Sequence, residues 1–187
     1  MRDMDSESYD YVSTVVDIVK RIISSLDPEE VLGYLTESVT KAMHAKAASV
    51  RLLDEAGDRL EMRAVYGLSD AYLNKGPVEL ERSAIDRHIL DGNVTQLADV
   101  RQDGNFQYPD EARKEGIVSV ASAPMIAHDK PIGVLRVYSS ETRSFSHLET
   151  RFLEAVAELA ALAMHNASLY HRLKTDHHEL IDIFLPG

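Results

Sequence analysis

An arginine stands inside the apolar segment PIGVLRVYS, residues 131–139, whose pattern is that of a β-strand. Side chains alternate along a strand, so Arg136 shares one face with Val134 and Tyr138. A guanidinium group offers a planar fork of N–H donors that fits a carboxylate or a phosphate. The strand face that carries Arg136 is therefore either exposed to water or the floor of an anion-binding pocket.

A second arginine has the same setting in the segment ASVRLLD, residues 48–54. By the same alternation, Arg51 shares a face with Ser49 and Leu53. Burying a guanidinium group costs free energy unless an anion lies against it. A covered face would therefore need a counter-charge, which is either a bound carboxylate or phosphate or an acidic side chain of the chain itself.

The long connection DVRQDGNFQYPDEARKEG, residues 99–116, holds candidate acidic partners for the arginines and candidate residues for covering a ligand. Asp99, Asp103 or Asp110 is expected to pair with the arginines if no ligand does so, unless this face is open to water. Phe106 and Tyr108 could cover the ring of a ligand, or they could be plugs that close the core.

Other kinds of chemistry find little support in the composition. The chain has no cysteine, which excludes disulfides, thiolate catalysis, cysteine-ligated zinc and thioether-linked chromophores. The eight histidines show no metal-binding spacing, and no G-x-S-x-G motif is present, so we expect neither a metal site nor an enzyme. The net charge of -11 makes nucleic acid a poor partner.

The chain also lacks the signals of export or membrane insertion. The start MRDMDSESYD is acidic and polar, unlike a secretory signal. No apolar run reaches the roughly 18 residues that a membrane helix needs. A cytoplasmic location is therefore expected.

The elements that position the arginines follow from periodicity. Residues 12–26 and 28–43 have helical spacing, residues 48–66 and 118–139 each form a strand hairpin, and residues 147–184 form a long helix. Strands that come as hairpins favour an α+β fold on an antiparallel sheet. The apolar stripe of the first helix comprises Val12, Val16, Val19, Ile23 and Leu26. The expected division of the chain is an N-terminal helix at 1–27, a sheet domain at 28–146 and a C-terminal helix at 147–187.

Several segments together resemble a GAF domain over roughly residues 28 to 173. They are AASVRLLDEAGDRLEMRAVYGL, LADVRQDGNF, and the run from GIVSVASAP through IGVL to NASLY. The resemblance implies a six-stranded antiparallel sheet, with the N- and C-terminal helices on one face and a loop-covered ligand pocket on the other. The family's strand order makes the two arginine strands neighbours, with Gly133 on the helix side allowing a close approach. The candidate pocket residues are then Ser49, Arg51, Asp99, Phe106, Tyr108, Ser119, Arg136 and Tyr138.

The resemblance also narrows the range of ligands that we expect. Bilin-binding members attach their chromophore through cysteine and the family's methionine-R-sulfoxide reductases use catalytic cysteines, so neither property is expected here. The cyclic-nucleotide signature of the phosphodiesterase type would fall on Ser139, Ser140, Phe145, Glu149 and Thr150, of which only Phe145 matches. The cofactor is thus unknown, and the expected ligand is a small molecule, anionic if the arginines bind it.

The last helix carries a heptad seam with alternating steps of four and three residues. Its candidate dimer residues are Val156, Leu159, Ala163, Asn166, Tyr170 and Leu173. A helix of this length, about 55 Å at 1.5 Å per residue, exceeds what one small sheet covers. We therefore expect a homodimer, with the N-terminal helix joining a parallel four-helix arrangement, although the first half of the seam could instead pack only on the sheet.

These expectations combine into one function and one alternative. The first is a non-enzymatic sensory domain that passes a ligand signal through dimerised terminal helices to an output domain, whose linker would begin near IDIFLPG. The alternative is a dimerisation or scaffold module that binds no ligand.

Overall fold

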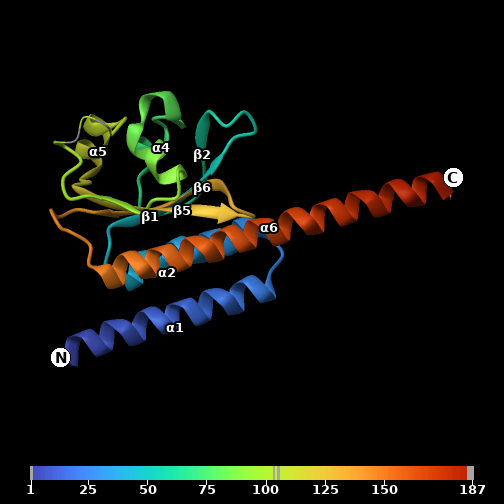
Figure 1. The fold of residues 1–187 in the computed structure, drawn as a ribbon, viewed down its shortest axis with the longest axis horizontal. Coiled ribbons are helices and arrows are strands. Elements are labelled where there is room, and N and C mark those ends of the chain that lie inside the picture. Colours follow the sequence, from blue (N-terminus) through green and yellow to red (C-terminus); the bar gives the residue numbers. More distant parts are fainter. Residues whose placement is uncertain (1, 103, 105, 185–187) are drawn as a thin grey trace.

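The structure is a computed structural model that describes residues 2–102, 104 and 106–184, with side chains described for 10–102, 104 and 106–170. Figure 1 shows its elements. They are α1 (Arg2–Ser24), α2 (Pro28–Ala42), β1 (Ala47–Leu53), β2 (Arg59–Tyr66), α3 (Asp70–Leu73), β3 (Val78–Glu79), the 3-10 turn η1 (Leu80–Arg82), α4 (Ala84–Leu90), β4 (Thr95–Leu97), α5 (Pro109–Glu115), β5 (Ser119–Ala127), β6 (Lys130–Ser139) and α6 (His147–Phe184).

The strands form one six-stranded sheet in the order β3-β2-β1-β6-β5-β4. All pairings are antiparallel, which confirms the expected α+β architecture. The two arginine strands are neighbours, since β1 pairs with β6 and places Ser49 opposite Arg136 and Arg51 opposite Val134.

Helices α2 and α6 cover one face of the sheet, and α3, α4 and α5 lie over the other (Figure 1). We call the second face the loop face. Strand alternation is as predicted: Val50, Leu135 and Val137 pack under α2 and α6, whereas Val134 and Tyr138 lie in smaller clusters on the loop face.

Gly133 is needed for a reason other than the one expected. A Cβ atom at this position would lie 2.2 Å from the carbonyl oxygen of Arg51 on the neighbouring strand. The register of the β1–β2 pair shifts between Val50 and Arg51, so the backbone is irregular there. The close approach is therefore made by strand β1 and not by a helix.

Helix α1 forms an outer layer that packs on α2 and α6 (Figure 1). The face that it buries differs from the predicted one. Tyr11, Ile18 and Ile22 enter the core, and the Tyr11 ring stacks on Phe152 of α6 at 4.4 Å between centroids. The predicted stripe Val12, Val16, Val19, Ile23 and Leu26 lies beside them, and Ile23 is 79% exposed.

Helix α6 begins with a capping box, because the amide of Ser146 donates to the Glu149 carboxylate and the amide of Glu149 donates to the Ser146 hydroxyl. The first half of its seam packs inside this chain: Val156 and Ala163 are buried in the core, so they are not available to a second copy. This corrects their assignment as dimer residues.

The second half of α6 runs beyond the sheet (Figure 1). Leu159 is half-buried against the core, Asn166 and Tyr170 are exposed, and the side chain of Leu173 lies outside the described residues. In the part of the chain that is described, no helix combines the length and apolar character needed to cross a bilayer.

Candidate anion-binding site

Arg136 lies on the loop face with its charge compensated. The side chain is 4% exposed, and its Nη2 atom lies 2.7 Å from Oδ1 of Asp86 on α4. Its Nε–H donates to the Ser122 hydroxyl at 2.7 Å, and its guanidinium carbon lies 5.7 Å from the centroid of the Phe106 ring. The other Asp86 oxygen accepts a hydrogen bond from Ser83 at 2.7 Å. Although burial acts to lower it, the pKa of Arg136 is raised by the charge of Asp86.

Arg51 lies on the same face, and no described residue compensates its charge in this way. Arg51 is 3% exposed, and its Nε atom has no hydrogen-bond partner among the residues that the structure describes. No ion pair to Arg51 is formed by any residue that the structure describes. A buried guanidinium group without a counter-charge is costly.

Lys75, between α3 and β3, is a third cation in this region. Its Nζ atom is buried and has no hydrogen-bond partner among the described residues. Nζ lies 4.0 Å from the centroid of the Tyr72 ring and 5.1 Å from that of Tyr108. Burial and the positive charges of Arg51 and Arg136 lower the pKa of Lys75 to about 7.

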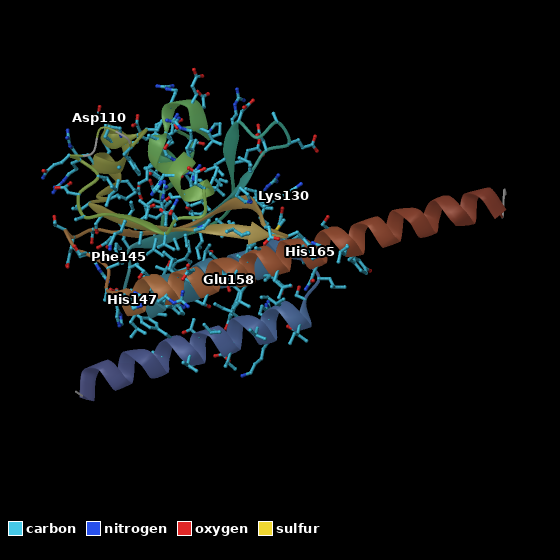
Figure 2. All side chains as sticks on the ribbon, viewed as in Figure 1. Asp110, Lys130, Phe145, His147, Glu158 and His165 are labelled. Carbon is cyan, nitrogen blue, oxygen red and sulfur yellow. The ribbon has the colours of Figure 1, made fainter. Side chains whose placement is uncertain are left out.

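Tyrosines form the wall beside these cations. The hydroxyl of Tyr138 shares a 2.9 Å hydrogen bond with Ser49, and the Tyr72 ring meets the Tyr138 ring edge-on at 6.3 Å. Burial raises the pKa of Tyr72, so this phenol stays neutral. Tyr108 donates to the Pro77 carbonyl oxygen at 2.8 Å. Side chains fill the space between the sheet and helices α4 and α5 (Figure 2).

Among the residues that the structure describes, the charges of the loop face do not balance. Arg51, Lys75 and Arg136 are cationic, and Asp86 is the buried carboxylate that faces them. Glu111, half-buried on α5, acts on Lys75 only through its field. Because Asp86 neutralises Arg136, Arg51 and Lys75 remain, and two such cations are suited to binding an anion.

Two of the three acidic residues proposed as partners of the arginines, Asp99 and Asp110, pair with other residues. Asp99 pairs with Arg101 at 2.7 Å, which holds the Asp99 pKa below its usual range. Oδ1 of Asp110 lies 3.6 Å from Nη1 of Arg113 at the surface. Asp103 lies outside the described residues. The carboxylate beside Arg136 comes from α4 instead.

Ser119 also lies away from the arginines. It has the strand parity of Ala121, which packs toward α6, and its hydroxyl donates to the Glu141 carbonyl oxygen at 2.8 Å. Ser122, of opposite parity, is the serine of β5 that reaches Arg136. Phe106 is where the sequence suggested, 7% exposed and against the Arg136 guanidinium group.

Four residues of this region were missed by sequence reasoning: Tyr72, Lys75, Asp86 and Ser122. Asp86 had a detectable signal, because it lies on the same helical face as Ile89, three residues on. Ser122 had one too, since it follows Val120 in strand alternation. Nothing in the sequence around Lys75 marks it as buried.

A sequence model described as the GAF domain matches residues 25–165. A comparison with curated protein sequences finds no match. Among solved structures, the chain is similar to the GAF domain of a phosphoenolpyruvate-protein phosphotransferase from Coxiella burnetii, with TM-score 0.78 and 18% identity over 88% of this chain and 98% of the other. The GAF domain of the Acinetobacter phosphoenolpyruvate-protein phosphotransferase has a TM-score of 0.73 and 24% sequence identity, over 84% of this chain and 94% of the other. Residues 122 to 287 of a methyl-accepting chemotaxis protein have a TM-score of 0.69 and 24% sequence identity, over 82% of this chain and 98% of the other.

Proposed function

Because the chain belongs to the GAF domain family, we propose that it is a non-enzymatic, cytoplasmic regulatory module that binds a small anion on the loop face of its sheet. In this proposal the ligand signal passes through the terminal helices of a homodimer to an output domain. The methyl-accepting chemotaxis protein among the similar structures is a signalling protein, which supports this context.

The observation that carries the proposal is the pair of unpaired cations. Arg51 and Lys75 place buried nitrogen atoms on one face, and neither nitrogen has a hydrogen-bond partner among the described residues. A bound anion would supply charge-assisted hydrogen bonds, each contributing roughly 1.5–3 kcal/mol. The same two side chains are difficult to explain as structural elements, because each costs stability in the unliganded protein.

The route to the helices follows from the packing. Strand β6 carries Arg136 on its loop face and Leu135 and Val137 on its helix face. Helix α6 packs on β5 and β6, so a shift of the central strands displaces α6 directly. The exposed stripe on α1 has heptad spacing, and Leu162 and Leu169 on α6 are exposed seven residues apart. These surfaces fit a second copy of the chain.

One observation favours the alternative of a scaffold that binds no ligand. Arg136 is neutralised by Asp86 and lies against the Phe106 ring, so this part of the loop face needs no ligand charge. In that reading the loop face is a second core, and dimerisation is the whole function.

Native mass spectrometry of the purified protein separates the two functions. We expect the wild type to carry a small anion, or to take one up from a metabolite extract, and Arg51→Met to lose it. Arg63→Met, at an exposed position of β2, is the matched control and should retain the ligand. An empty wild type that no small anion stabilises would favour the scaffold.

A further inference from the structure

The two unpaired cations of the loop face come from different parts of the chain. Arg51 lies on β1 in the centre of the sheet, and Lys75 lies in the connection between α3 and β3. Contacts link their surroundings: Lys75 Nζ lies 4.0 Å from the centroid of the Tyr72 ring, and that ring meets the Tyr138 ring edge-on at 6.3 Å. The Tyr138 hydroxyl in turn shares a hydrogen bond with Ser49, which lies on β1 as Arg51 does. Arg136 is the third cation, and its charge is matched by Asp86 at 2.7 Å. Among the described residues, two positive groups therefore remain without a counter-charge and are available to one ligand.

We propose that Arg51 and Lys75 together bind a small dianion, and that Lys75 is the residue that selects two negative charges over one. This inference rests on the proposed function, because it names the ligand class of the same site. A dicarboxylate and a phosphate monoester share the required chemistry. Arg51 supplies a planar fork for one anionic group, and Lys75 supplies a compact point charge for the second charge.

The setting of the Lys75 amine explains the selectivity. Tyr72 and Tyr108 hold Nζ between their rings, and the Tyr108 hydroxyl is itself fixed on the Pro77 carbonyl oxygen. The amine is thus in place before the ligand arrives, which reduces the ordering cost of binding. Aromatic faces compensate a cation only in part, so the charge of a ligand is still needed.

Protonation of Lys75 should be coupled to binding. The charged groups around the amine are Arg51 on β1 and Arg136 on β6, which disfavour its protonation, and Glu111 on α5 and Asp86 on α4, which favour it. A dianion beside Nζ adds negative charge and draws a proton onto the amine. The charge of a monoanion is already neutralised by Arg51, so a monoanion should draw less of a proton onto Lys75. Dianion affinity should therefore fall as the pH rises from 7.5 to 9.5, whereas monoanion affinity should change less.

Isothermal titration calorimetry with matched probes tests this inference. The probes are succinate against butyrate, and methyl phosphate against dimethyl phosphate, at pH 7.5 and 9.5. For at least one pair we expect the wild type to bind the dianion about ten times more tightly than the monoanion. Lys75→Met should weaken dianion binding by roughly 10- to 100-fold, the loss of one charge-assisted contact, and leave the monoanion within about threefold. The pair that shows the preference identifies a carboxylate or a phosphate site.

Lys114→Met is the matched control, because it removes the same charge from an exposed position on α5. It should keep both the dianion preference and its pH dependence. If the wild type binds anions with no preference for two charges, or Lys75→Met keeps the preference, the inference is wrong and the proposed function survives. If no probe binds or stabilises the wild type, the inference and the anion-binding function fail together.

Discussion

At the residue scale, Lys75 couples folding to pH. Its pKa is lowered from 10.5 to about 7 in the folded protein, chiefly by burial. Between these two values the unfolded chain binds more protons, so the free energy of unfolding should rise with pH from about 7 toward 10. Below pH 7 both states are protonated and the penalty is fully present.

We predict that Lys75→Met removes this rise and stabilises the unliganded protein at pH 7 by about 1–2 kcal/mol, a value reduced because the side chain is only half-buried. Urea unfolding of the wild type and the variant at pH 7, 8.5 and 10 measures both the stabilisation and the pH dependence. Lys114→Met, at the surface, should leave the slope unchanged. A Lys75→Met variant less stable than wild type would show that the amine has a stabilising partner.

The Asp86–Arg136 pair is predicted to be strongly coupled. Asp86→Asn leaves a buried guanidinium group without its counter-charge, which should cost about 3–5 kcal/mol of unfolding free energy. The double variant Asp86→Asn with Arg136→Met removes the uncompensated charge and should recover much of that loss. A double-mutant cycle by chemical denaturation gives the coupling energy. Additive effects would contradict the pairing that the 2.7 Å contact indicates.

At the element scale, the junction of β1 and β6 has no room for a side chain at position 133. Gly133→Ala would place a Cβ atom 2.2 Å from the Arg51 carbonyl oxygen, so the strands must separate locally. We expect a loss of about 1–3 kcal/mol, measured by thermal or urea unfolding. Gly33→Ala in α2 is the control: its Cβ meets nothing within 4 Å, and a helical alanine should stabilise by about 0.5–1 kcal/mol. Equal effects of the two changes would mean that the close approach does not constrain the sheet.

At the scale of the whole molecule, α1 has more apolar surface than one chain buries. Val12, Val16 and Ile23 are 61%, 46% and 79% exposed. We predict a dimer with twice the 20.9 kDa chain mass by multi-angle light scattering at micromolar concentration. Val16→Lys with Ile23→Lys should give a monomer, because each lysine places a charge in the apolar contact.

The control for this prediction is Ser13→Lys with Ser24→Lys. It adds the same charge to exposed polar positions of α1 outside the stripe and should remain dimeric. A monomeric wild type would remove the dimer from the proposed function.

The sequence was a good guide to the sheet and a weaker one to what covers it. Strand alternation placed Leu135 and Arg136 on their correct faces, because a period of two residues leaves no other choice. Helix α1 shows the limit of such reasoning. Two adjoining apolar stripes satisfy the same helical period, and only tertiary packing decides that Ile18 is buried while Ile23 is exposed. The partner of Arg136 was equally hidden, since Asp86 reaches it from fifty residues away.

The strand order has a consequence for how the chain is synthesised. Strand β1 can form its hairpin with β2 early, but its other edge has no partner until residues 130–139 have left the ribosome. Such late, non-local pairing slows folding and leaves a strand edge open to association with other nascent chains. Arg51 and Arg136 also come to lie on neighbouring strands only at this last step. A translation product that stops before β6 thus carries Arg51 on a sheet edge that has no partner strand.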